Sequence, residues 1–135
     1  MDSNTSKASE TSHFDDPRID EGICLFNQRE FFACHDVLED YWQELTCREK
    51  PFFQGLIQAA VALFHFEERN LGGALRMYTS CRAYMAEFEP EIAGINVTQL
   101  LSDLEICFAE LNKPHESYPF HVQLNPEFIP IIQRN

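Results

Sequence analysis

Two stretches of the chain place polar side chains that could do chemistry among apolar residues. Residues 31–42 read Phe-Phe-Ala-Cys-His-Asp-Val-Leu-Glu-Asp-Tyr-Trp, and residues 53–65 read Phe-Gln-Gly-Leu-Ile-Gln-Ala-Ala-Val-Ala-Leu-Phe-His. His35 and Glu39 are four positions apart, so a helix would bring both side chains onto one face. Buried polar groups are costly unless they have partners, so these side chains need partners if they are buried.

One hypothesis for these residues is a metal site. His35 and Glu39 have the spacing that lets one helix supply two ligands, and His65 could add a third from the next helix. Asp36 or Gln58 would then lie nearby. No Glu-x-x-His pair occurs, so the pattern of di-iron helical bundles is not met.

The alternative is a buried structural network in which Glu39 orients His35. Gln58 and His65 would then satisfy other buried groups. A third hypothesis is catalysis with His35 as a general base, but no Ser or Cys nucleophile motif accompanies it. Cys34 adjoins His35, although neighbours on a helix point about 100° apart. The polar cluster predicted in all three cases contains His35, Asp36, Glu39, Gln54, Gln58, His65 and Asn70.

Apolar periodicity predicts five helices that would position these side chains. Asp16-Pro17 and Asn96 are start signals, because Asp and Asn cap helices and Pro suits the first helical position. Gly72 and Gly73 are expected to permit close packing against a neighbouring helix. Arg69-Asn70 is expected to turn, with Asn70 suited to a left-handed conformation. The expected helices span roughly residues 17–26, 30–45, 51–68, 71–88 and 96–113.

The organisation along the chain indicates one all-α domain with no sheet. Residues 1–14 are expected to be a disordered tail, residues 15–112 an antiparallel bundle, and residues 113–135 an extended strap rich in Pro. In the strap, Tyr118, Phe120, Val122 and Leu124 alternate with polar residues, so one face should pack. Two helix–turn–helix units echo each other as tetratricopeptide-like hairpins, which predicts a closed bundle.

Composition limits the classes of partner. The formal net charge of −12 disfavours nucleic acid and anionic membranes. Five Cys occur without a Cys-x-x-Cys pair, so neither disulfides nor a zinc finger is indicated, which suggests a reducing compartment. The polar N-terminus does not resemble a signal peptide, and no run is long enough to span a membrane. We therefore expect a cytoplasmic protein.

The two stretches resemble a family of helical proteins catalogued as domain of unknown function three hundred and nine. Its signature is similar to Phe-Asn-x-x-Glu-Phe-Phe-x-x-His-Glu-x-Leu-Glu-x-x-Trp, followed by Gln-Gly-Leu-Ile-Gln-x-Ala, then His, Gly-Asn and Gly-Ala. The match covers roughly residues 20–80. Asp36 replaces the usual Glu after the His, and Arg69 stands where the family often has Gly. The resemblance implies an all-helical fold and supplies no activity. The matching residues are Phe26, Asn27, Glu30, Phe31, Phe32, His35, Leu38, Glu39, Trp42, Gln54, Gly55, Leu56, Ile57, Gln58, Ala60, His65, Asn70, Gly73 and Ala74.

These observations favour a non-enzymatic binding or scaffold module with a buried His/Glu/Gln cluster. The strap could mediate a homodimer or contact a protein partner. The alternative is a metal-binding protein or metal-dependent hydrolase centred on His35, Glu39 and His65. No cofactor is predicted beyond the divalent metal that this alternative would need.

Overall fold

Helix starts in the structure follow the capping residues. The structure is a computed structural model that describes residues 14–135. Asp16 accepts from the backbone N–H of Arg18 at 2.9 Å, and Asn96 accepts from that of Gln99 at 2.9 Å. Both predicted caps are therefore confirmed. The helices are α2 (Pro17–Asn27), α3 (Phe31–Glu44), α4 (Lys50–Glu67), α5 (Leu71–Ala86) and α6 (Val97–Phe108).

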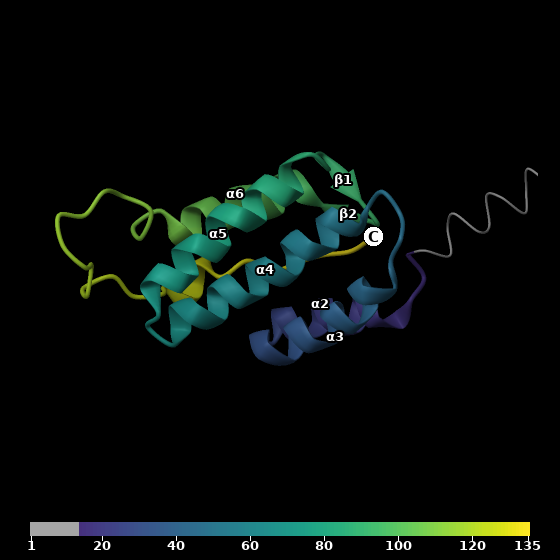
Figure 1. Cartoon of the computed structure of the whole chain (residues 1–135), viewed down its shortest axis with the longest axis horizontal. Coiled ribbons are helices and arrows are strands. Elements are labelled where there is room, and N and C mark those ends of the chain that lie inside the picture. Colours follow the sequence, from purple (N-terminus) through teal and green to yellow (C-terminus); the bar gives the residue numbers. More distant parts are fainter. Residues whose placement is uncertain (1–13) are drawn as a thin grey trace, which may run out of the picture.

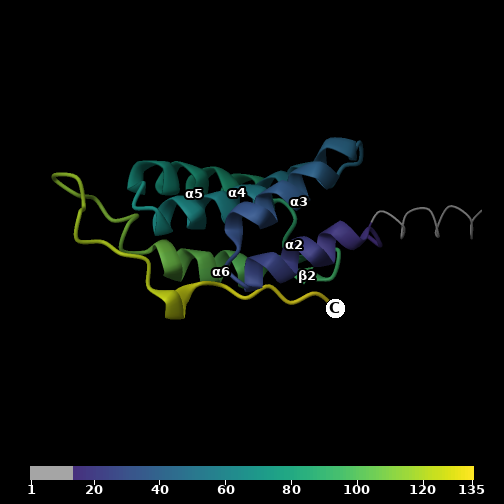
Figure 2. The same ribbon diagram turned by 90° about the horizontal axis from the view of Figure 1, so that it is seen from below.

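The all-α bundle is confirmed, and α4 is its central helix. Figure 1 shows α4 lying between α3 and α5. Seen from below, α4 and α5 form one layer, and α6 lies beneath them with the C-terminal segment (Figure 2). Ten of the eighteen residues of α4 are buried, including Phe52, Leu56 and Leu63, as expected for a helix that is apolar almost all round. None of the described helices combines the length and hydropathy that a membrane crossing requires.

A small sheet that the sequence did not predict interrupts the helices. Strands β1 (Glu91–Ile92) and β2 (Ile95–Asn96) pair antiparallel through Ile92 and Ile95. The turn residues Ala93 and Gly94 both have positive φ, as a tight hairpin turn of this kind requires. The C-terminus joins this hairpin, because Arg134 bridges Ile95. The expectation of no sheet was therefore wrong.

The turn between α2 and α3 and the turn between α4 and α5 have the same backbone geometry. This similarity confirms the prediction of two similar helical hairpins. Arg29 and Arg69 take left-handed conformations, with φ of 65° and 64°. The following N–H groups donate back into the preceding helix, from Glu30 to Leu25 at 2.9 Å and from Asn70 to His65 at 2.8 Å. Asn70 was expected in the left-handed position, but it instead caps α5 through the N–H of Gly73 at 3.1 Å.

Gly73 makes room for that cap, and the close helix approach occurs elsewhere. A Cβ at position 73 would lie 2.7 Å from the side-chain nitrogen of Asn70. The expectation that Gly72 and Gly73 let a neighbouring helix approach was therefore wrong. Gly55 has that role instead, since a Cβ there would lie 2.6 Å from Cγ of Met85 on α5.

The C-terminal segment, residues 113–135, is called the strap below. Its first part forms a loop that projects past the helices, and its later part lies along α6 and α2 (Figure 2). It contains a short 3-10 turn, η1 (Pro126–Phe128). Its buried side chains are Val122, Ile129 and Ile132, whereas Leu124 is half-buried. Tyr118 and Phe120 are exposed, contrary to the expected packed stripe. Their rings pack on each other, with centroids 4.6 Å apart, and the hydroxyl of Tyr118 accepts from the N–H of Leu71 at the start of α5 at 3.2 Å.

The turns hold the strap by its backbone. The guanidinium of Arg29 donates to the carbonyl of Pro126 at 3.1 Å, and that of Arg69 donates to the carbonyls of Val122 and Phe120. Asn27 makes two bonds of 2.8 Å with the carbonyl and N–H of Ile132. These contacts explain why Arg is accommodated at a left-handed position that Gly would occupy with less strain.

At the other end of the chain, the expected disordered tail of residues 1–14 lies mostly outside the described residues, which begin at Phe14. Phe14 itself packs near Phe53 on α4, with ring centroids 6.4 Å apart, and its carbonyl accepts from Arg134 of the strap.

Replacing Asn27 with Ala should destabilise the fold by about 1–3 kcal/mol, because the N–H and carbonyl of Ile132 lose their partners in a part-buried place. Urea denaturation followed by circular dichroism measures this change. The matched control is Gln28→Ala, an exposed neighbour on the same helix end, which should change stability by less than about 0.5 kcal/mol. Equal stability of the two variants would show that the amide does not hold the strap.

Candidate functional site

Helix α3 presents its acidic and imidazole side chains at the edge of its contact with α4. Nε2 of His35 lies 2.7 Å from Oε2 of Glu39, one turn further along the helix. Oδ1 of Asp36 lies 3.2 Å from Nδ1 of His35, without the geometry of a hydrogen bond. The predicted pairing of His35 with Glu39 is therefore present. Its geometry places a ring N–H on the Nε2 side and an acceptor lone pair at Nδ1 when the ring is neutral.

The expected burial of this cluster was wrong. The side chains of His35 and Glu39 are 27% and 42% exposed, and no polar or charged residue of the described chain is classed as buried. The reason is the position of α3, which buries Phe31, Cys34, Leu38 and Tyr41 against the core. The polar pair lies beside that stripe and is partly exposed to solvent.

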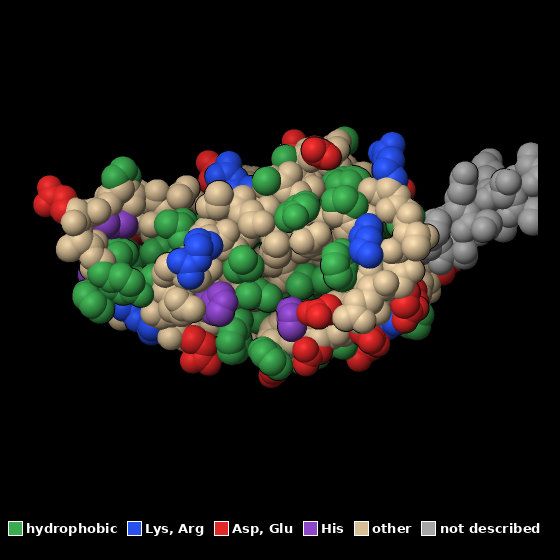
Figure 3. Space-filling view, viewed as in Figure 1, with side chains coloured by type: hydrophobic (Ala, Val, Ile, Leu, Met, Phe, Trp, Pro, Cys, Tyr) green, Lys and Arg blue, Asp and Glu red, His purple; other side chains and the backbone are tan. Residues whose placement is uncertain are grey.

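An apolar hollow opens beside the pair, between α3 and α4. Its volume is about 130 Å³, and Phe31, Phe32, His35, Val61, Phe64 and His65 line it. The ring of Phe32 lies 5.5 Å from that of Phe64 and 5.7 Å from that of His35. Phe32 is 59% exposed, so its ring forms an open wall of the hollow. Figure 3 shows histidine and hydrophobic side chains lying next to each other over these helices.

The structure brings together some of the predicted cluster and separates the rest. His35 and His65 line the hollow, and Glu39 and Asp36 contact His35. Asn70 caps α5, and its amide nitrogen lies 3.4 Å from Nδ1 of His65.

Gln54 and Gln58 are half-buried on α4 and do not line the hollow. The sequence analysis did not single out Phe64, although its position one turn after Val61 could have indicated a shared wall.

We call the contact between α3 and α4 the seam. Three polar side-chain atoms of these two helices are buried from solvent and have no hydrogen-bond partner. They are Nδ1 of His35, Nε1 of Trp42 and Oε1 of Gln58. The ring of Trp42 instead lies under the ammonium group of Lys50, at 4.4 Å from the ring centroid. Unpaired polar atoms of this kind are rare in native interiors. Three of the four such atoms in the described part of the chain belong to α3 and α4, and the fourth is the hydroxyl of Tyr78 on α5.

The three candidate metal ligands do not form one set. Among the described residues, no group of three or more His, Cys, Asp or Glu side chains is arranged to hold an ion. His35 and Glu39 are in contact with each other, whereas His65 lies beside Asn70. A site built from all three would therefore need the side chains to rearrange.

The cysteine next to His35 faces the core. Cys34 is fully buried, and burial raises the pKa of its thiol to about 12. The same cause raises the pKa values of Cys81 and Cys107 to about 12. Because the thiolate is the nucleophile, Cys34 is not activated for attack by its neighbour.

Comparison with known proteins agrees with the resemblance. The model of the family Domain of unknown function (DUF309) matches residues 19–77, which contain most of α2, all of α3 and α4, and the first part of α5. Residues 19–77 are therefore similar to this family. The match includes every residue that lines the hollow.

Two relatives are similar to this chain over a region longer than residues 19–77. The uncharacterized protein YpuF of Bacillus subtilis (strain 168) is 36% identical over 96 residues, which are 69% of this chain and 55% of the relative. An uncharacterized protein of Aquifex aeolicus (strain VF5) is 31% identical over 101 residues, which are 73% of this chain and 30% of the relative. The chain thus spans about half or less of the length of these curated relatives.

Removing the Glu39 carboxylate should cost little stability. Because Glu39 is 42% exposed, its contact with His35 resembles a surface pair four residues apart on a helix. Glu39→Ala should therefore destabilise the protein by about 0.2–0.5 kcal/mol in urea denaturation. Glu39→Gln serves as the control of equal shape. A loss above about 1 kcal/mol for both variants would show that the carboxylate belongs to a buried network after all.

Thiol reactivity checks the position of Cys34. At pH 8, N-ethylmaleimide should modify the exposed Cys24 of the native protein. Cys34, Cys81 and Cys107 should react only after unfolding in urea, because thiols with pKa values of about 12 hold almost no thiolate at that pH. Mass spectrometry of the peptides measures this. Native labelling of Cys34 at the rate of Cys24 would contradict this and show that Cys34 is a reactive thiol.

Proposed function

We propose that this domain is a non-enzymatic binding module whose α3–α4 hollow receives an apolar side chain of a protein partner. The observation that carries the proposal is the open aromatic wall made by Phe32 and Phe64. Four of the six lining residues are apolar and the other two are the imidazoles of His35 and His65. Phe32 is exposed and Phe64 is half-buried, and an exposed aromatic side chain beside a hollow is typical of interaction sites.

The size of the hollow supports a single inserted group. An apolar cavity of roughly 150 Å³ holds a benzene-sized molecule. The volume of about 130 Å³ between α3 and α4 therefore suits one aliphatic or aromatic side chain. The exposed carboxylates of Asp36 and Glu39 lie on one side and can contact a donor that flanks the inserted group.

The same hollow weighs against catalysis. Cys34 is turned into the core, and the Nε2 atom of His35 is already engaged by Glu39. The metal-dependent alternative on His35, Glu39 and His65 requires the rearrangement described above. We therefore place it second, as an outcome of the tests below.

Selection of a random peptide library on the purified chain tests the binding proposal. Enriched peptides should share a large apolar residue, and Phe32→Ser should weaken their binding at least about tenfold in fluorescence anisotropy, or about 1.4 kcal/mol. The matched control is Ile106→Ser, which removes an exposed apolar side chain from α6 and should leave the affinity unchanged. Peptides that bind both variants equally well would contradict the site.

A separate measurement tests the alternative hypothesis of a metal site on His35, Glu39 and His65. Elemental analysis of protein purified without an affinity tag, followed by titration with Zn²⁺, measures stoichiometric binding. Binding that is lost in both His35→Ala and His65→Ala, and that weakens as pH falls, would replace the proposal by a metal site, because ligating imidazoles must be neutral.

A further inference from the structure

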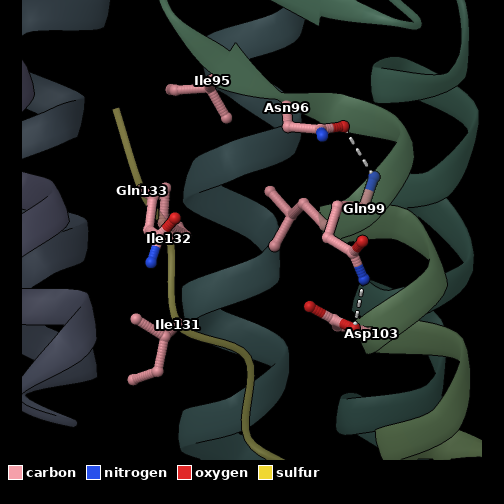
Figure 4. A pocket seen from close by; sticks show the side chains of 8 residues that line it. Ile95, Asn96, Gln99, Asp103, Ile131, Ile132 and Gln133 are labelled. Atoms are coloured by element: carbon pink, nitrogen blue, oxygen red, sulfur yellow. Dashed lines mark hydrogen bonds between the residues drawn. The ribbon is translucent and has the colours of Figure 1, made fainter. Parts of the chain in front are cut away.

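A second open surface lies on α6, away from the α3–α4 hollow. The strap and α6 enclose two adjoining hollows of about 340 and 420 Å³, which share Asp103 and Ile131 as lining residues. Figure 4 shows the first of them, with Gln99 and Asp103 of α6 facing Ile131, Ile132 and Gln133 of the strap. We call this continuous surface the α6–strap groove.

Apolar side chains are exposed along this groove. Ile106, Phe128 and Ile131 are 52%, 47% and 56% exposed, and all three line the second hollow. They account for three of the six large hydrophobic side chains that the described chain leaves exposed. Such a concentration of apolar surface marks an interaction site more often than a solvent face.

Contacts within the chain fix both walls of the groove in the absence of a partner. On one side of Ile131, Ile129 is buried, and on the other Ile132 is buried and held by Asn27 through two bonds of 2.8 Å. On the helical wall, the amide of Gln99 donates to Asp103 at 2.9 Å. A surface fixed in this way loses little conformational entropy on binding.

The negative charge of the groove favours a cationic ligand. Asp103 and Glu127 are the charged residues that line the two hollows, and no Lys, Arg or His lines either of them. The whole chain carries a formal net charge of −12. A second copy of the chain would bring like charges together, whereas a cationic segment would gain attraction at every carboxylate.

The shape of the helical wall suits a helix. Gln99, Asp103 and Ile106 are spaced i, i+4 and i+7, so they form one stripe of about 10 Å along α6. An amphipathic helix presents its own anchors at the same spacing. We propose that the α6–strap groove is a docking site for a basic amphipathic helix of a partner protein. This site is independent of the α3–α4 hollow.

Two designed peptides test the site with the full chain. The probe is a fluorescein-labelled amphipathic helix of Leu and Lys, and its matched control has Glu in place of every Lys. In fluorescence anisotropy the Lys peptide should bind at least about tenfold more tightly than the Glu peptide. Neutralising the groove with Asp103→Asn and Glu127→Gln should remove most of that difference.

Substitutions of equal charge separate docking from general attraction. Ile106→Asp makes the chain more acidic, so non-specific attraction would strengthen, whereas docking in the groove should weaken at least about tenfold. Phe120→Asp adds the same charge at an exposed aromatic residue that lines neither the groove nor the α3–α4 hollow, and it should leave binding of the Lys peptide unchanged. Phe32→Asp tests the α3–α4 hollow in the same way. Ile131→Ser, on the strap wall, provides a second variant should the first unfold, as judged by circular dichroism.

Each contrary outcome overturns the inference in a different way. Binding that survives Ile106→Asp and Ile131→Ser would show attraction without a site. Binding that is lost in Phe32→Asp instead would place the peptide at the α3–α4 hollow, which supports the proposed function and not this one. A dimer in light scattering that Ile106→Asp splits into monomers would assign the groove to a second copy of the chain.

Discussion

Burial of α4 is the constraint on which the rest of the structure depends. A helix with ten buried positions among eighteen cannot be covered by one neighbour, so α3 and α5 must pack on opposite sides of it. Gly55 lets α5 approach closely, since any side chain there would meet Met85. The few polar positions of α4, among them Gln58 and His65, are then restricted to the strip between its neighbours. The candidate site lies on that strip.

The seam between α3 and α4 combines two kinds of incomplete burial. The core-facing stripe of α3 is fully covered, but Phe32 remains in solvent beside Phe64. Nearby, Nδ1 of His35 and Oε1 of Gln58 are out of water without a partner. Exposed aromatic side chains beside a hollow often belong to interaction sites, and buried polar atoms without partners are rare in native proteins. Their coincidence on one seam is the physical basis for proposing that a partner completes it.

The strap couples the two hairpins to the C-terminus. Arg29 and Arg69 occupy equivalent left-handed positions, and each donates to strap carbonyls from its own turn. Such bonds recognise backbone, so they position the strap without depending on its side chains. Ile129 and Ile132 are then buried, while Phe128 and Ile131 between them stay exposed above α6. The same interactions that close the bundle therefore create the α6–strap groove.

The sequence by itself determined the helices, two of their capping residues, the repeat of the hairpin and the resemblance of residues 19–77 to a known family. These are local properties: Asp16 and Asn96 cap their own helices, and apolar spacing records which face of each helix is buried. It also predicted the contact of His35 with Glu39, because four positions of a helix fix that distance.

Only the tertiary structure decided how deeply that pair is buried, because exposure depends on how α3 packs beside α4. It likewise decided the β1–β2 hairpin, which the C-terminal Arg134 bridges, and the exposure of Tyr118 and Phe120. Each of these features arises from contacts between residues far apart in the chain, which periodicity along a single element does not record.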